Sequence, residues 1–96
     1  MPIYLILGNY TDQGIRNIKE TTKRAENFRA LAKKMGVTVK EIYWTMGRYD
    51  IATIIDAPDD ATASRLLLAA GSLGNVRTET LRAYTADEIS SILKGM

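Results

Sequence analysis

Met46-Gly47-Arg48-Tyr49-Asp50 and the residues that follow it carry the clearest structural signals of this chain. Gly47-Arg48 places glycine first, which is typical of a two-residue hairpin turn between strands predicted over 37–46 and 51–55. Ala57-Pro58-Asp59-Asp60 then marks a helix start, because proline suits the first turn and acidic residues suit its positive end. The middle of the chain therefore predicts a hairpin followed at once by a helix.

Residues 1–36 predict a strand and one long helix. The run from Ile3 to Asn9 is β-branched, aromatic and aliphatic, as in a buried strand. Thr11 can cap a helix that Gly36 ends, and Tyr10 is spaced to pack on Ile15. Apolar side chains then recur at steps of three and four, which predicts one buried stripe: Ile15, Ile18, Thr22, Ala25, Phe28, Ala32 and Met35.

The last third of the chain completes a split βαβ repeat. A helix over 61–70 should stop at Gly71 and Gly74, a strand is predicted over 75–84, and Thr85-Ala86-Asp87-Glu88 is a capping box for a short last helix. The order of elements predicts one α+β domain over 1–96 with the ferredoxin-like βαββαβ fold. We expect a four-stranded antiparallel sheet of order 4-1-3-2, two helices on one face and a C-terminal helix.

Both faces of the predicted sheet are apolar. Ile3, Leu5 and Leu7 point to one face of the first strand, while Tyr4, Ile6 and Tyr10 point to the other. The two main helices can fill only one face, and an exposed apolar face on so small a domain needs a cover. The simplest cover is another copy, so we expect a homodimer or higher homo-oligomer formed through the sheet.

Composition excludes several function classes. The chain has no Cys and no His, which removes a thiolate nucleophile, an imidazole base and the preferred zinc ligands. A net charge of +2 on 96 residues predicts no large field for nucleic acid or an acidic membrane. The start of the chain lacks the features of a signal peptide, and no stretch is long enough to span a membrane. We expect a cytoplasmic protein without cofactor or metal.

The motifs together resemble the GYD domain family across nearly the whole chain. The matching residues are Tyr10-Thr11 with Gly14, Arg24, Gly47, Tyr49-Asp50, Ala57-Pro58-Asp59-Asp60 and Arg77-Thr78-Glu79-Thr80. One departure is Arg48, which stands between Gly47 and Tyr49. The resemblance implies a ferredoxin-like unit related to the dimeric α/β barrels, in which two sheets pack face to face. That superfamily includes cofactor-free oxygenases, heme or chlorite enzymes and ligand-sensing regulatory modules.

Asp50 is the first candidate for a binding site. It opens the predicted third strand beside the end of the first, so its carboxylate should lie near Tyr10 and the start of the first helix. It could anchor a ligand at a pocket bounded by Tyr10, Tyr49 and Arg77. Alternatively, the carboxylate accepts hydrogen bonds only from the hairpin or from the free amides at the helix start, which is the more common role of a carboxylate at a turn.

Two further groups of side chains have open roles. Arg24 flanks the apolar stripe of the first helix and is interpreted as a solvated side chain or as an anion contact. Trp44 could line an aromatic pocket or pack in a dimer, as could Tyr4, Tyr43 and Tyr84. The carboxylates of Asp56, Asp59 and Asp60 are close enough in sequence for a hard cation, but a helix start explains them without metal.

Whether the protein is an enzyme stays open at this point. A homo-oligomeric module that binds a small molecule or has a regulatory task fits the absence of a catalytic set best. The alternatives are an enzyme similar to the cofactor-free oxygenases and a purely structural assembly protein.

Overall fold

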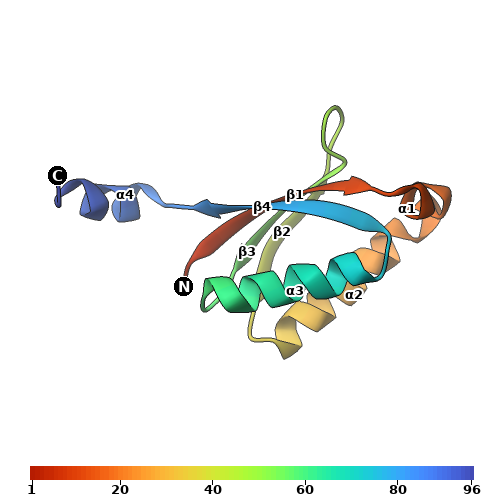
Figure 1. Ribbon diagram of the computed structural model, residues 1–96, viewed down its shortest axis with the longest axis horizontal. Helices are drawn as coiled ribbons and strands as arrows, with labels where there is room; N and C mark the ends of the chain where they lie inside the picture. Colours follow the sequence, from red (N-terminus) through yellow and green to blue (C-terminus); the bar gives the residue numbers. More distant parts are fainter.

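A computed structural model describes residues 1–96 and has the predicted α+β architecture (Figure 1). The elements follow in the predicted order, except that the first helix is divided into pieces. They are β1 (Ile3–Tyr10), α1 (Asp12–Arg16), the 3-10 turn η1 (Ile18–Glu20), α2 (Thr21–Lys34), β2 (Thr38–Trp44), β3 (Ile51–Asp56), α3 (Asp60–Ser72), β4 (Val76–Ala83) and α4 (Ala86–Leu93).

The four strands form one antiparallel sheet in the order β2-β3-β1-β4. This is the predicted order read from the other edge. Leu5 at the centre of β1 lies opposite Ile54 of β3 on one side and Leu81 of β4 on the other. The pairing of β2 with β3 is irregular between Val39 and Glu41. All four predicted strands are therefore present, and they pair in the predicted order.

Helices α2 and α3 cover one face of the sheet (Figure 1). Alternate side chains of the central strands, including Tyr4, Ile6 and Ile55, point to these helices and are buried. Side chains of a strand alternate between faces, so the residues between them point the other way. The core is the single layer between sheet and helices: Tyr4, Ile6, Ala32, Val37, Ile55, Ala57, Ala63, Leu66 and Leu67.

The opposite face of the sheet, which we call the open face, has no helix over it (Figure 1). Its central residues come from three neighbouring strands and lie in register, as the pairing of Leu5 with Ile54 and Leu81 shows. Leu81 remains 42% exposed and Tyr43 52% exposed. The apolar residues of the open face are Ile3, Leu5, Leu7, Tyr43, Ala52, Ile54, Leu81 and Ala83.

Helix α4 extends away from the rest of the molecule (Figure 1). Thr85 and Glu88 form the predicted capping box at its start. Its apolar residues Ile89, Ile92 and Leu93 are 41%, 53% and 54% exposed. The radius of gyration is 14.4 Å, against about 12.5 Å for a compact domain of this length. The extra size reflects this outlying helix.

The prediction of one continuous first helix was wrong. The chain leaves the helical conformation at Asn17, whose φ and ψ are −106° and 37°. Arg24 compensates for the break, because its Nη2 donates to the carbonyl oxygens of Gly14 at 3.0 Å and Asn17 at 2.9 Å. The break turns Ile15 and Ile18 outward, where they are 51% and 37% exposed instead of buried in the stripe.

The hairpin loop is also longer than the predicted two-residue turn. The amide of Thr45 donates to the carbonyl oxygen of Asp50 at 2.8 Å, which leaves residues 46–49 as the loop. Gly47 has a φ of +106°, a conformation that other residues rarely adopt, so the glycine is needed as expected. No helix of the chain is long and apolar enough to cross a membrane.

Gly14 holds α1 against the loop that precedes β4. A Cβ on Gly14 would lie 2.0 Å from the carbonyl oxygen of Asn75, which is far inside contact distance. We expect Gly14→Ala to lower the free energy of unfolding by about 1–3 kcal/mol, because the helix must shift away from that backbone.

Gly71→Ala is the matched control for this change. Gly71 lies in α3 with open space around an added Cβ, so alanine should raise stability by about 0.5–1 kcal/mol through its higher helix propensity. Urea unfolding of both variants measures the two effects. Equal stability of Gly14→Ala and the parent would contradict the close approach at Asn75.

Candidate functional site

A cavity of about 140 Å³ lies on the helix side of the sheet, between β1, β3 and the helices α2 and α3. Most of its lining is hydrophobic, with Ile6, Phe28, Ile42, Leu67 and Ala70 among the contributing residues. Trp44, which is 44% exposed, also lines it and places part of the cavity wall at the surface. The cavity can therefore take up an apolar group that arrives from solvent.

Hydroxyl and indole groups meet at one end of the cavity around Thr21, the first residue of α2. The indole Nε1 of Trp44 donates to Thr21 Oγ1 at 3.0 Å. The hydroxyl of Tyr10 lies 2.9 Å from the same oxygen. One threonine thus ties β1, β2 and α2 together and fixes the orientation of two aromatic side chains at the cavity.

Arg24 lines the same end of the cavity. Its guanidinium carbon lies 5.8 Å from the centre of the Tyr10 ring. Nη2 donates to the carbonyl oxygens of Gly14 and Asn17 beside the break in the first helix, whereas Nε and Nη1 are buried without a hydrogen-bond partner. Arg24 is therefore not the solvated side chain that its position in the sequence favoured.

Asp50 connects the ends of the first and third strands. Its Oδ2 accepts from the amide of Tyr10 at 2.9 Å, and its own amide donates to the carbonyl oxygen of Gly8 at 2.9 Å. The carboxylate lies beside Tyr10, as the sequence predicted. It continues the pairing of β1 with β3 beyond the last ladder pair and does not line the cavity.

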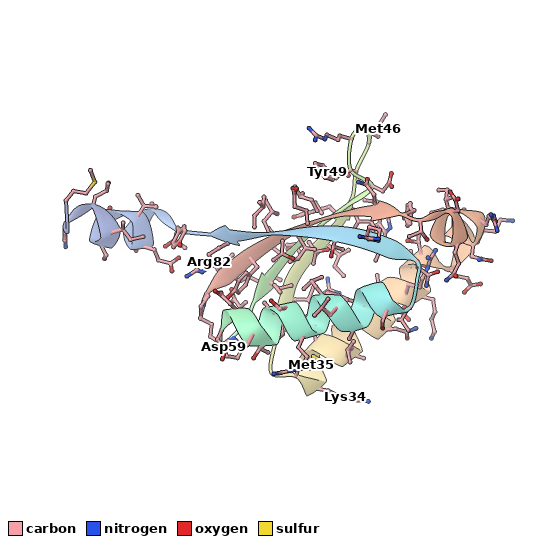
Figure 2. All side chains as sticks on the ribbon, in the orientation of Figure 1. Lys34, Met35, Met46, Tyr49, Asp59 and Arg82 are labelled. Atoms are coloured by element: carbon pink, nitrogen blue, oxygen red, sulfur yellow. The ribbon has the colours of Figure 1, made fainter.

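Tyr49 and Arg77 do not join Tyr10 in one pocket. Arg77 lies opposite Asn9 in the sheet, on the face away from the helices. The Tyr49 hydroxyl donates to Glu79 on that same face at 3.3 Å. Figure 2 shows Tyr49 on the hairpin, which projects away from α2 and α3. The structure separates the predicted pocket residues into two groups on opposite faces.

The other aromatic side chains also occupy separate places. Tyr4 is 3% exposed in the core, where its hydroxyl donates to the Asp60 carboxylate at the start of α3. Tyr43 stands on the open face. The Tyr84 ring lies 4.5 Å from the guanidinium carbon of Arg82, at the approach to α4. Only Trp44 of the four predicted aromatic candidates lines the cavity.

The three carboxylates between β3 and α3 each have their own contact. Asp59 caps α3 by accepting from the Thr62 amide at 2.8 Å, and the hydrogen bonds with Thr62 hold the pKa of its carboxyl below the usual range. Asp56 forms an ion pair with Lys40 at 3.7 Å. Asp60 receives the Tyr4 hydroxyl. The helix-start interpretation is therefore correct for Asp59, which is the cap, and for Asp60 in the first turn of α3, but not for Asp56, which ends β3 and pairs with Lys40.

Thr21 is the site residue that sequence reasoning missed. The apolar stripe places this threonine in the interior of a continuous helix, where a hydroxyl has no special meaning. Asn17 offered a weak signal, since asparagine competes with helical hydrogen bonding and favours helix ends. A helix start at Thr21 follows from that break and directs its hydroxyl to Tyr10 and Trp44.

Asp50 gives a direct test of its structural contact. Asp50→Ala removes the acceptor of the Tyr10 amide, and we expect a loss of about 1–3 kcal/mol in the free energy of unfolding because a half-buried donor is left unpaired. Asp50→Asn keeps an acceptor oxygen and should cost about 0.5–1 kcal/mol. Denaturant unfolding measures both. An alanine variant as stable as the parent would rule out this contact as a source of stability.

Tyr4 gives a prediction for alkaline pH. Burial, followed by the hydrogen bond and the negative charge of Asp60, raises the pKa of the Tyr4 hydroxyl from 10.0 to about 12. Because the folded state disfavours the tyrosinate, this contribution to stability is complete below pH 10 and is lost as the pH rises toward 12.

Tyr4→Phe should therefore flatten the fall in stability over that range, since phenylalanine has no proton to lose. The measurement compares the two proteins in thermal unfolding at several values of pH between 10 and 12. If the stability of parent and variant falls in parallel as the pH rises, Tyr4 is not the source of that fall.

Comparisons with known proteins identify the family and a similar fold. The model of the GYD domain matches residues 4–93. A protein of Thermus thermophilus named "Glutamine synthetase and cystathionine beta-lyase binding protein" is 32% identical over 95 residues, which are 98% of this chain and 100% of that protein. The crystal structure of TTHA0845, also from Thermus thermophilus, superimposes with a TM-score of 0.56 at 23% identity, over 90% of this chain and 96% of that one. This chain belongs to the GYD domain family.

Proposed function

We propose that this chain is a homo-oligomeric binding module with a regulatory task, formed as a single domain over residues 1–96. Its open face is the surface on which a second copy docks, and the rim of that face is where protein partners make contact. The apolar open face of the sheet is the observation that supports this proposal most strongly. The cavity on the other side of the sheet gives the module a place for a small molecule.

The open face has the organisation of a protein contact surface. Leu5, Ile54 and Leu81 lie side by side at its centre. Charged residues flank them, with Arg77 and Glu79 on β4 and the Lys40–Asp56 ion pair at the other end. An apolar centre with a charged rim is common in protein interfaces. Two copies packed face to face would remove the apolar centres of both from water.

Helix α4 supports the same interpretation. Isolated helices shorter than about 12–15 residues are only marginally stable in water. Helix α4 has eight residues. Helix α4 extends away from its own domain and exposes an apolar side formed by Ile89, Ile92 and Leu93. A second copy would provide the surface on which this side packs. The helix and the open face would then belong to one interface.

The name of the Thermus relative suggests what else docks here. That protein is described as binding glutamine synthetase and cystathionine β-lyase. We propose that this chain likewise binds metabolic enzymes and so regulates them by contact. A regulatory task by contact needs a surface and requires no catalytic set, which fits a chain without His or Cys.

Three of the residues predicted to bind a ligand are retained in this proposal. Tyr10, Arg24 and Trp44 would contact a small molecule in the cavity. Tyr49 and Arg77 belong instead to the rim of the open face, where we propose that they contact a protein. Asp50 would act on the ligand only indirectly, by holding Tyr10 in place.

Light scattering behind a sizing column at micromolar concentration tests the assembly. We expect the parent to be a dimer or a higher oligomer. Leu81→Glu places a charge at the centre of the open face and should give a monomer in which the sheet and helices α2 and α3 remain folded. Leu68→Glu is the matched control, since Leu68 is 74% exposed on α3, away from the open face. A monomeric parent, or equal effects of both changes, would overturn the proposal.

A further inference from the structure

We propose that the cavity binds an uncharged molecule about the size of one ring that carries one hydroxyl or carbonyl group, and that Thr53 forms a hydrogen bond with this group. This ligand class deepens the small-molecule part of the proposed function, on which it rests. Phenol is the simplest molecule of the class. Two features of the cavity floor support it, the hydroxyl of Thr53 and the missing side chain of Gly8.

The sheet forms the floor of the cavity with rows of paired residues. Thr53 of β3 lies opposite Ile6 of β1 on one side and Ile42 of β2 on the other, and all three line the cavity. Gly8 and Ile51 form the next row on the same face and line the cavity as well. The Thr53 hydroxyl therefore stands on an otherwise aliphatic floor.

This hydroxyl is buried but has no partner within the protein. Thr53 is 6% exposed, and it makes none of the side-chain hydrogen bonds of the molecule. The unpartnered side-chain atoms that are fully sealed by packing belong to Arg24 and Asp56, so the Thr53 oxygen still borders open space. Because Thr53 lines the cavity, that space is the cavity.

A ligand with one polar group would satisfy the Thr53 hydroxyl. A buried hydroxyl without a hydrogen bond is unfavourable, and a threonine hydroxyl can both donate and accept. Asn27 and Thr78 also line the cavity, but both are exposed and can bond to water. Thr53 is therefore the polar group of the lining that gains most from a ligand.

Gly8 indicates that a ligand approaches the same floor. It is buried in the interior of β1, where glycine weakens a strand. Its φ is not positive, its pairing with both neighbouring strands is regular, and an added Cβ would meet its nearest neighbour, Cγ2 of Thr78, at an ordinary 3.5 Å. Neither backbone nor packing requires a glycine here. Such a glycine often marks a place where a ligand comes close to the backbone.

The rest of the lining sets the size and the charge of the ligand. The cavity volume of about 140 Å³ is close to that of an engineered apolar cavity of about 150 Å³ that binds benzene. Arg24 is the one charged residue of the lining; its Nη2 already donates to two carbonyl oxygens, and its Nε and Nη1 are sealed. An ion would lose its hydration without gaining a partner, so the ligand should be uncharged.

Phenol and toluene are suitable probes, because they differ only in a hydroxyl or a methyl group on the same ring. Nuclear magnetic resonance titration of the labelled protein measures each Kd, and the amide signals of Gly8 and Thr53 report occupancy of the floor. We expect both probes to shift these signals saturably. Thr53→Val replaces the hydroxyl by a methyl group of similar shape and should weaken phenol binding by about tenfold without weakening toluene binding.

Three further variants assign the effect. Thr53→Ser keeps the hydroxyl and should keep the ratio of the two Kd values. Thr80→Val is the matched control, because Thr80 lies opposite Ile6 in β4 but is exposed and does not line the cavity. Gly8→Val fills the floor and should weaken both probes by about tenfold while the protein still folds. Thr53→Ala removes the same hydroxyl if Thr53→Val fails to fold.

Three results would overturn the inference, and they separate it from the function on which it rests. An equal effect of Thr53→Val on phenol and toluene would exclude the hydrogen bond but leave a small-molecule site in place. Binding that Gly8→Val does not weaken would place the ligand elsewhere. No saturable shift with either probe would overturn both the inference and the small-molecule part of the proposed function.

Discussion

A sheet has two faces, and the two main helices of this chain cover only one of them. Tyr4, Ile6 and Ile55 turn to the helices and form the core. Leu5 lies between two of these residues in the sequence and points away from them. Because β1 is apolar at nearly every position, this alternation leaves an apolar surface without a cover. The open face, the outlying α4 and the proposed assembly all follow from this constraint.

On the covered face of the sheet, the break in the first helix shapes the end of the cavity around Thr21. The helical chain breaks at Asn17, Arg24 donates to the carbonyl oxygens of Gly14 and Asn17 beside the break, and Gly14 allows α1 to approach Asn75. The same break makes Thr21 the first residue of α2, within hydrogen-bond distance of Tyr10 and Trp44. A local interruption of one helix thus positions a half-buried arginine and two aromatic rings at one end of the cavity.

Most of the fold could be predicted because its signals are local. The alternation in β1, the caps at Thr11, Asp59 and Thr85, and the positive φ of Gly36 and Gly47 each depend on a few neighbouring residues. The strand order then follows from general rules of connection. The break at Asn17 could not be predicted in this way, because its compensation comes from Arg24, seven residues further on and in another helix.

The prediction that Tyr10 and Arg77 share one pocket was wrong for a different reason. Tyr10 and Arg77 are near each other in the sheet, but they belong to neighbouring pairs in the register and so point to opposite faces. Counting alternation across two paired strands would have separated them.

Intermolecular contacts at the open face are the most direct test of the proposed assembly. In a mixture of isotope-labelled and unlabelled protein, filtered nuclear Overhauser spectra detect only contacts between copies. We expect such contacts from the methyl groups of Leu5, Ile54 and Leu81 at the centre of the open face. Contacts confined to Leu68 and Leu73 around α3, or none at a concentration where the protein is fully assembled, would contradict an interface at the open face.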